Sequence, residues 1–137
     1  MCGLRRRILF VLVTGLVGTA CSGCSDILWS GNLAGAQRQA AKDGRLVLVY
    51  YWSWLNEDCD RMDRTVFNDQ AVIDTMAGTI PVRLDAAFHR RWARERGIER
   101  LPSFVIYSPD GAVISTRQGT MNEGQFRAFV VSGKLNR

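Results

Sequence analysis

The hydrophobic positions along the chain follow two spacings, and their alternation predicts an ordered series of helices and strands. Helical spacing marks five segments: residues 32–43, 58–67, 70–76, 87–96 and 123–131. Short β-branched and aromatic runs mark four strands: residues 46–52, 80–84, 103–107 and 112–116. The run from 46 to 52 is apolar at nearly every position, which is typical of an interior strand covered on both faces.

The order of these elements predicts the fold class. A strand–helix–strand unit predicts parallel pairing through a crossover, whereas the last two strands, joined by a turn at residues 108–111, predict an antiparallel edge. The chain of 137 residues is long enough for one ordinary domain with its own core. We therefore predict a single α/β domain in which helices cover both faces of a mixed central sheet.

The N-terminus has the pattern of a secretory signal. Three arginines at positions 5–7 precede an uncharged apolar run, residues 8–20, that is too short to cross a bilayer comfortably as a helix. We expect residues 1–20 to be removed as a signal peptide and the mature protein to be extracytoplasmic (periplasmic). Their removal lowers the formal net charge from +5 to +2, because it takes away three arginines and no acidic residue. The basic pI therefore gives no reason to expect a nucleic-acid partner.

The end of the apolar run resembles a bacterial lipobox, in which a cysteine becomes lipid-modified and starts the mature protein. Residues 16–21 carry this pattern, with Gly18 in place of the usual leucine and Cys21 at the modified position. We expect lipidated Cys21 to anchor the protein to a membrane, residues 21–27 to form a tether, and residues 28–137 to form the folded domain. The alternative is ordinary signal cleavage, which would release the domain.

The four cysteines differ in what they can do. Cys2 lies in the signal, while Cys21 and Cys24 have the spacing of a redox or metal pair but precede the domain, without a second pair or clustered histidines. Cys59 is then the only cysteine inside the predicted domain. A disulfide between Cys24 and Cys59 is a further alternative. The only histidine, His89, lies among arginines on a predicted helix, which indicates a solvated surface position.

Cys59 lies in the first turn of the helix that follows the predicted interior strand. A thiol there is close to unpaired backbone N–H groups and to the positive end of the helix dipole, which favours the thiolate. The acidic residues around it oppose the thiolate: Glu57, Asp58, Asp60 and Asp63. Two interpretations of Cys59 stay open, a small core residue and a single reactive thiol.

With these elements placed, the chain resembles the thioredoxin-fold family, in particular the thioredoxin-like domains of secreted thiol-disulfide interchange proteins. The matching segments are residues 40–49, Trp54, and residues 59–62, 66–69, 82–85 and 97–104. The last of these resembles the loop that carries the family's cis-proline, here Pro102. The resemblance covers residues 28–131 and implies a thioredoxin-like fold.

The chain departs from the family at the active site. The family motif is Trp-Cys-x-x-Cys, but here one extra residue separates Trp54 from Cys59. Alignment on Trp54 puts Leu55 at the position of the first cysteine, and alignment on Cys59 puts Asn56 there. Either way the attacking cysteine is absent, and the resemblance implies that Cys59 has the resolving position, where access is poor.

The resemblance leaves two functional hypotheses. In the first, a membrane-tethered extracytoplasmic domain lacks the dithiol, is redox-inactive or weakly active, and binds an extracytoplasmic protein or peptide. The residues that the resemblance assigns to this binding are Trp54, Asn56, Leu101 and Pro102. In the second, Cys59 acts alone as the catalytic thiol of a monothiol oxidoreductase that forms mixed disulfides. The sequence shows no phosphate loop, catalytic carboxylate pair or metal-ligand cluster, so we expect neither a cofactor nor a metal.

A band of arginines occupies the fourth predicted helix and the segment after it. Its members are Arg90, Arg91, Arg94, Arg96 and Arg100. Such a band is usually a solvated face, but on a tethered domain it can also meet anionic lipid headgroups or an acidic partner.

Overall fold

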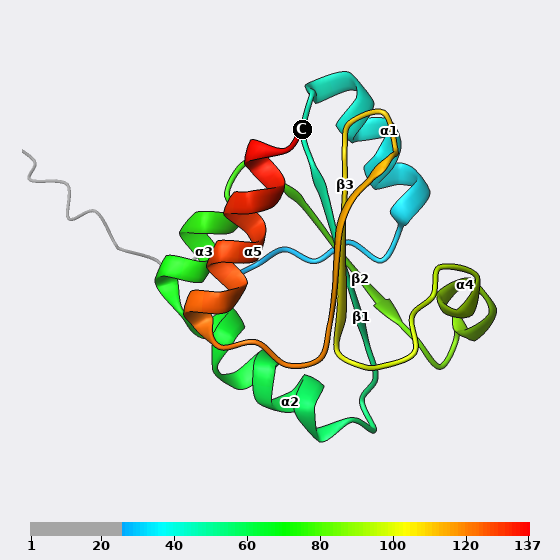
Figure 1. Cartoon of the computed structure of the whole chain (residues 1–137), viewed down its shortest axis with the longest axis vertical. Coiled ribbons are helices and arrows are strands. Elements are labelled where there is room, and N and C mark those ends of the chain that lie inside the picture. The colour runs from blue at the N-terminus through cyan, green and yellow to red at the C-terminus, as the bar shows by residue number, and fades with distance from the viewer. Residues whose placement is uncertain (1–25) are drawn as a thin grey trace, which may run out of the picture.

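A four-stranded mixed sheet forms the centre of the computed structural model, which describes residues 26–137 (Figure 1). The elements in chain order are α1 (Leu33–Asp43), β1 (Val47–Trp52), α2 (Glu57–Arg64), the 3-10 helix η1 (Val66–Asn68), α3 (Gln70–Met76), β2 (Ile80–Asp85), α4 (Arg90–Glu95), β3 (Ser103–Tyr107), β4 (Val113–Gln118) and α5 (Glu123–Leu135). The strands lie in the order β2-β1-β3-β4. β1 pairs parallel with β2 and antiparallel with β3, and β4 pairs antiparallel with β3. The predicted mixed sheet, with β1 in its interior, is confirmed.

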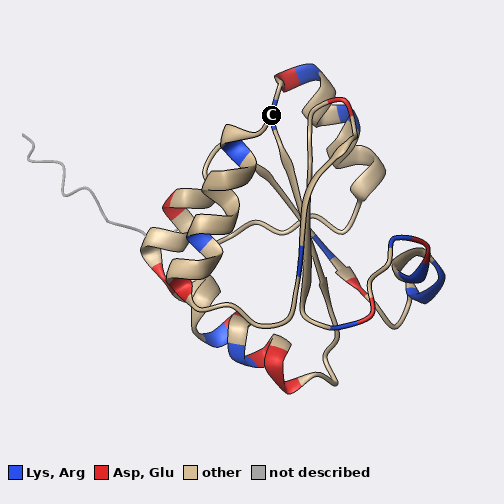
Figure 2. Ribbon diagram, viewed as in Figure 1, with Lys and Arg blue, Asp and Glu red and all other residues tan. Residues whose placement is uncertain are grey.

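Helices cover both faces of this sheet, as the sequence predicted. α2, α3 and α5 lie on one face, and α1 and α4 lie on the other (Figure 1). The face under α2, α3 and α5 holds an aromatic cluster, in which neighbouring ring centroids lie 4.9 to 6.2 Å apart. The cluster consists of Tyr50, Phe67, Phe104 and Phe126. Charge is unevenly placed: acidic residues gather at the start of α2, and arginines gather on α4 (Figure 2).

Side-chain caps set where four of the α-helices within residues 26–137 begin. The capping residues are Asn32 for α1, Asn56 for α2, Asp69 for α3 and Asn122 for α5. Each side chain accepts a hydrogen bond of 2.8 to 3.0 Å from the backbone N–H three residues later, which satisfies a donor that the helix leaves unpaired. Gly44 ends α1 in the left-handed conformation that a residue with a Cβ rarely adopts.

The helix predicted over residues 58–67 is shorter in the structure. It ends at Arg64, and η1 follows after a break. The Thr65 hydroxyl donates a hydrogen bond to the Arg61 carbonyl at 2.9 Å, and the Asn68 amide donates one to the Arg64 carbonyl at 3.0 Å. These side chains satisfy the last carbonyls of α2 in place of further helical turns.

The helix predicted over residues 87–96 is also shorter. Asp85 at the end of β2 holds a turn before it: its carboxylate accepts a hydrogen bond from the Ala87 N–H at 2.8 Å, and its carbonyl accepts one from the His89 N–H at 3.1 Å. This turn occupies the first residues of the predicted helix, so α4 begins only at Arg90.

None of the helices within residues 26–137 combines the length and apolarity needed to cross a membrane. The predicted signal peptide, the lipidation site Cys21 and the neighbouring Cys24 lie outside the described residues.

Candidate functional site

The loop between β1 and α2 is where the resemblance places the chemistry. Its backbone turns at Ser53, whose carbonyl accepts a hydrogen bond from the Asn56 N–H at 3.1 Å. The Asn56 side chain then caps α2, since its Oδ1 accepts a hydrogen bond from the Cys59 N–H at 3.0 Å. This turn leaves Trp54 and Leu55 68% and 71% exposed. Two large apolar side chains therefore face solvent beside the start of α2.

Of the two residues that could stand in for the missing cysteine, Asn56 is the one at the N-cap of α2. Leu55 lies in the loop before the helix. An amide oxygen therefore accepts a hydrogen bond from one free N–H group of the first helical turn, that of Cys59, at a point where a thiolate could have done so.

The Cys59 side chain is fully buried, at 0% exposure, in the cluster beneath α2. Its backbone carbonyl accepts a hydrogen bond from the Tyr50 hydroxyl at 3.3 Å. Burial raises the pKa of the Cys59 thiol above its ordinary value, although the Ser53 backbone and the Tyr50 side chain act to lower it. The Asp63 carboxylate raises this pKa further. A protonated, inaccessible sulfur is a poor nucleophile.

A partly buried ion pair lies near Cys59, on the same side of α2. Asp63, four residues after Cys59, has a carboxylate oxygen 2.5 Å from a guanidinium nitrogen of Arg83 in β2. The Arg83 guanidinium carbon also lies 3.9 Å from the centroid of the Trp52 ring. Burial raises the pKa of the Asp63 carboxyl, although Arg83 acts to lower it. Sequence reasoning missed this pair. The one signal in the sequence was the four-residue spacing of Cys59 and Asp63, which places Asp63 on the same side of the helix as Cys59.

The second loop of the site carries a cis peptide bond between Leu101 and Pro102, as the resemblance implied. Pro102 is buried. Gln118 at the end of β4 holds the segment before this bond, because its Oε1 accepts hydrogen bonds from the N–H groups of Glu99 and Arg100, each at 3.0 Å. The sheet therefore fixes the backbone of this loop.

A pocket of about 260 Å³ lies between the β1–α2 loop, α4 and the cis-proline loop. Leu55 lines it from the first loop and Leu101 from the second. Three arginines also line it: Arg90, Arg94 and Arg100. The two loops that the resemblance brought together thus share one concave surface.

The predicted binding residues have different places around this pocket. Leu101 lines it, whereas Pro102 is buried and Asn56 is occupied in capping α2. Trp54 is exposed but is not among the lining residues. The apolar wall from the first loop is therefore Leu55.

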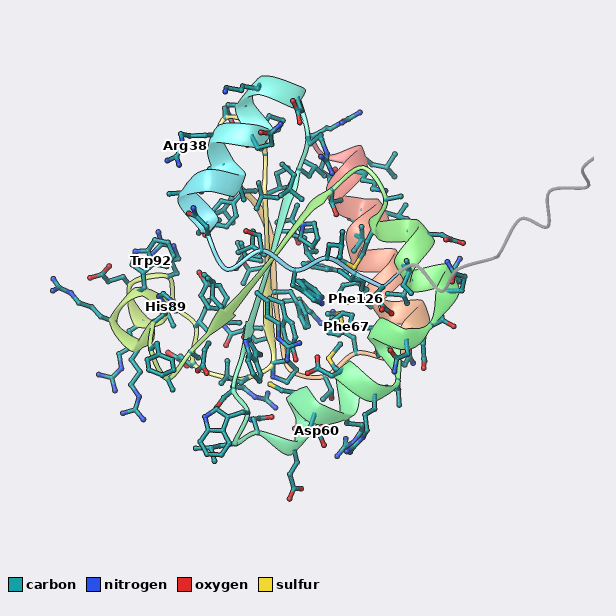
Figure 3. All side chains as sticks on the ribbon, turned by 180° about the vertical axis from the view of Figure 1, so that it is seen from behind. Arg38, Asp60, Phe67, His89, Trp92 and Phe126 are labelled. Atoms are coloured by element: carbon teal, nitrogen blue, oxygen red, sulfur yellow. The ribbon has the colours of Figure 1, made fainter. Side chains whose placement is uncertain are left out.

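His89 is not part of the Cys59 site. It lines a separate pocket of about 670 Å³ between the start of α1 and α4, with its ring 6.1 Å from that of Trp92. Figure 3 shows His89, at the N-cap of α4, and Trp92, on α4, apart from Asp60 on α2. Within residues 26–137, no group of three or more histidine, cysteine or acidic side chains is placed to hold a metal ion.

The strand order, the helix that begins beside Cys59 and the cis-proline loop define the thioredoxin-like class of α/β fold. The chain belongs to the thioredoxin-like domain family, whose model matches residues 33–133. No curated protein sequence matches the chain.

Solved structures of similar fold include thioredoxins and Dsb proteins. A thioredoxin from Thermus thermophilus aligns over 77% of this chain and 85% of its own, with 22% identity and a TM-score of 0.67. A DsbH oxidoreductase aligns over 89% of this chain and 94% of its own, with 11% identity and a TM-score of 0.71. The C-terminal domain of Neisseria meningitidis DsbD, in the oxidised form, aligns over 77% of this chain and 93% of its own, with 18% identity and a TM-score of 0.61. These similarities establish the fold, and function has to be argued from the site.

Proposed function

We propose that this protein is an extracytoplasmic thioredoxin-like domain that binds a partner polypeptide without dithiol exchange. A membrane tether through lipidated Cys21 belongs to the same proposal. The observation that supports it best is the arrangement of Asn56 and Cys59: an amide caps α2 where exchange requires a thiolate, and the remaining sulfur is buried.

Thiol-disulfide exchange makes two demands on a protein thiol. It must lose its proton, and its sulfur must reach the substrate disulfide so that a new S–S bond forms while the departing sulfur takes the electron pair. The Asn56 amide forms no S–S bond. Cys59 is buried with a raised pKa, so it cannot attack unless α2 opens. The same burial argues against the alternative, a monothiol oxidoreductase acting through Cys59.

The two loops are suited to binding an extended polypeptide. Leu55 offers exposed apolar surface at the rim of the pocket, and Leu101 offers a partly buried wall on the other side. Because Gln118 accepts hydrogen bonds from the backbone of the second loop and so holds it, little ordering of that loop is needed on binding.

Reduction of insulin disulfides in the presence of dithiothreitol tests the chemical part of this proposal. We expect the natural chain to give no turnover, and Asn56→Cys to gain it, because the new thiol lies at the N-cap three residues before Cys59. Leu55→Cys is the matched control, since its thiol lies in the loop before the helix, and we expect no gain. Turnover by the natural chain that disappears in Cys59→Ser would contradict the proposal and support the monothiol alternative.

Incorporation of radiolabelled fatty acid in a bacterial host tests the tether. We expect the full chain to be labelled, Cys21→Ser to lose the label, and Cys24→Ser to keep it. An unlabelled natural chain would contradict the tether while leaving the binding proposal in place.

A further inference from the structure

We propose that the pocket between the two loops binds carboxylate side chains of an acidic segment in a partner polypeptide. This inference rests on the proposed binding function and adds the chemistry of the partner. We call the site the arginine pocket and define it by Arg90, Arg94, Arg100, Leu55 and Leu101.

The three arginines come from two segments that the fold brings together. Arg90 and Arg94 are four residues apart on α4 and so share one side of that helix. Arg100 belongs to the loop before the cis bond. All three are exposed and line the same pocket. Figure 2 shows the basic residues of α4 on the side of the sheet away from α3 and α5.

These arginines have charge available for a ligand. Among residues 26–137, no acidic side chain forms an ion pair with any of them. Their neighbours are occupied: Arg91 pairs with Glu95 at 3.0 Å, and the Arg96 guanidinium lies 4.0 Å from the centroid of the Trp92 ring. Glu99 is the one acidic residue that lines the pocket, so positive charge dominates. Guanidinium groups bind carboxylates through paired hydrogen bonds.

The shape of the pocket indicates which acidic ligand fits it. Its volume of about 260 Å³ suits one or two side chains and is too small for a folded element. Ala93 and Ile98 give it a buried apolar base, which suits the methylene groups of a glutamate. Side chains that bind a membrane surface project from the protein, whereas these arginines line a hollow. The pocket therefore favours an acidic side chain over lipid headgroups. Leu55 at the rim can contact the next residue of the same segment.

Fluorescence anisotropy with three labelled peptides of equal length tests the inference. The peptides carry Glu, Gln or Lys at the same positions and are titrated with the full chain. We expect the Glu peptide to bind about tenfold more tightly than the Gln peptide at low salt, as two or three exposed ion pairs would give. That preference should largely vanish in about 1 M salt, where the Debye length is about 3 Å.

Paired variants separate the pocket from the overall charge. Arg90→Gln combined with Arg94→Gln should abolish most of the preference for the Glu peptide. Arg38→Gln combined with Arg127→Gln removes the same charge from exposed positions outside the pocket and should keep the preference. All four side chains are exposed, so far-UV circular dichroism should show every variant folded.

The outcomes distinguish this inference from the binding function on which it rests. Equal affinity for the Glu and Gln peptides would overturn the acidic preference and leave the binding function standing. Failure of all three peptides to bind would overturn both. Binding to phosphatidylcholine vesicles that requires phosphatidylglycerol and the pocket arginines, without a preference for the Glu peptide, would overturn the inference in favour of a lipid surface.

Discussion

Among single residues, Cys59 has a thiol pKa on which two effects act in opposite directions. Its position in the first turn of α2 lies near the positive end of the helix dipole, which favours the thiolate. Its complete burial removes water from around the charge, which favours the thiol. Burial is the largest cause of the raised pKa, and it outweighs the lowering by the Ser53 backbone and the Tyr50 side chain. Cys59 is therefore packed as a small core residue is.

We predict that Cys59 is alkylated slowly in the folded protein. At ~pH 8, iodoacetamide should modify it at least about tenfold more slowly in the native chain than in guanidinium chloride, where the thiol is exposed and its pKa is ordinary. Mass spectrometry of the peptide that contains Cys59 gives this rate separately from those of the N-terminal cysteines. Equal rates in the two states would contradict the burial of the sulfur.

The raised pKa also predicts how stability depends on pH. Because the Cys59 thiol has a higher pKa in the folded than in the unfolded state, the unfolded chain loses this proton first as the pH rises. The free energy of unfolding should therefore fall as the pH rises above the ordinary thiol pKa of 9.0. Cys59→Ala lacks this contribution, so its stability should fall less steeply. Urea unfolding at a series of alkaline pH values measures the two slopes, and identical slopes would contradict the shift.

We predict a clear difference between the partly buried ion pair and an exposed one. The pair of Arg83 and Asp63 is only 23% and 27% exposed, and Arg83→Gln leaves the carboxylate without its cation, so we expect a loss of about 1–3 kcal/mol. Arg64→Gln breaks an exposed pair with Asp60 and should change stability by at most about 0.5 kcal/mol. The loss in Arg83→Gln should shrink as the pH falls and Asp63 becomes protonated. Urea unfolding measures the stability of both variants, and equal losses would show that the burial of the Arg83–Asp63 pair is unimportant.

Among the elements, α5 approaches the sheet closely through a glycine. A Cβ atom at Gly133 would lie 2.6 Å from Cδ1 of Ile106 in β3, which is closer than such atoms can come. Gly124 lies in the first turn of the same helix. A Cβ atom there would have Oδ1 of Asn122 as its nearest neighbour, at 3.5 Å, which is an ordinary contact. A side chain at Gly133 would therefore force either Ile106 or the helix to shift.

We predict that alanine has opposite effects at these two glycines. Gly133→Ala should lower stability by about 1–2 kcal/mol, because Ile106 must move in a packed core. Gly124→Ala should raise it by up to about 1 kcal/mol, because alanine has the higher helix propensity and fits the space. Thermal unfolding followed by circular dichroism measures both. A loss of similar size in the two variants would contradict the assignment of the Gly133→Ala loss to the contact with Ile106.

The elements were predictable where their boundaries are set by neighbouring residues. The helix at 70–76 and the strand at 103–107 have the predicted bounds, since Asp69 caps the first and Pro102 precedes the second. The helix predicted over 87–96 was too long, because hydrophobic spacing does not reveal the turn held by the Asp85 side chain.

From the residues alone the site was predictable only where it is local in sequence, and the resemblance to the family added the cis-proline loop. The three-residue spacing of Asn56 and Cys59 could be recognised directly, because both belong to one helix start. The contact between Asp63 and Arg83 joins α2 to β2, and the arginine pocket joins three separate segments. Only the packing of the whole sheet reveals such contacts.

In the whole molecule, two hydrophobic clusters share the central strands. Alternate residues of β1 belong to opposite clusters, with Leu48 and Tyr50 in one and Val47, Val49 and Tyr51 in the other. β3 contributes to both clusters in the same way. Loss of packing on one face therefore weakens the strands that support the other.

We predict that both faces unfold in a single transition. Leu33→Ala in α1 should cost about 2–4 kcal/mol and Phe126→Leu in α5 about 1–2 kcal/mol, since both side chains are buried. Each variant should shift far-UV circular dichroism and tryptophan fluorescence together. Separate transitions in either variant would mean that the two clusters unfold independently.

The Asn56 cap also determines how the proposed binding surface responds to its surroundings. A carboxamide gains and loses no electrons in these conditions, so the first turn of α2 keeps its hydrogen bond in reducing and oxidising media alike. A partner that binds this loop would contact the same surface in either medium. The fraction of protein bound to that partner would then not depend on the ambient redox potential.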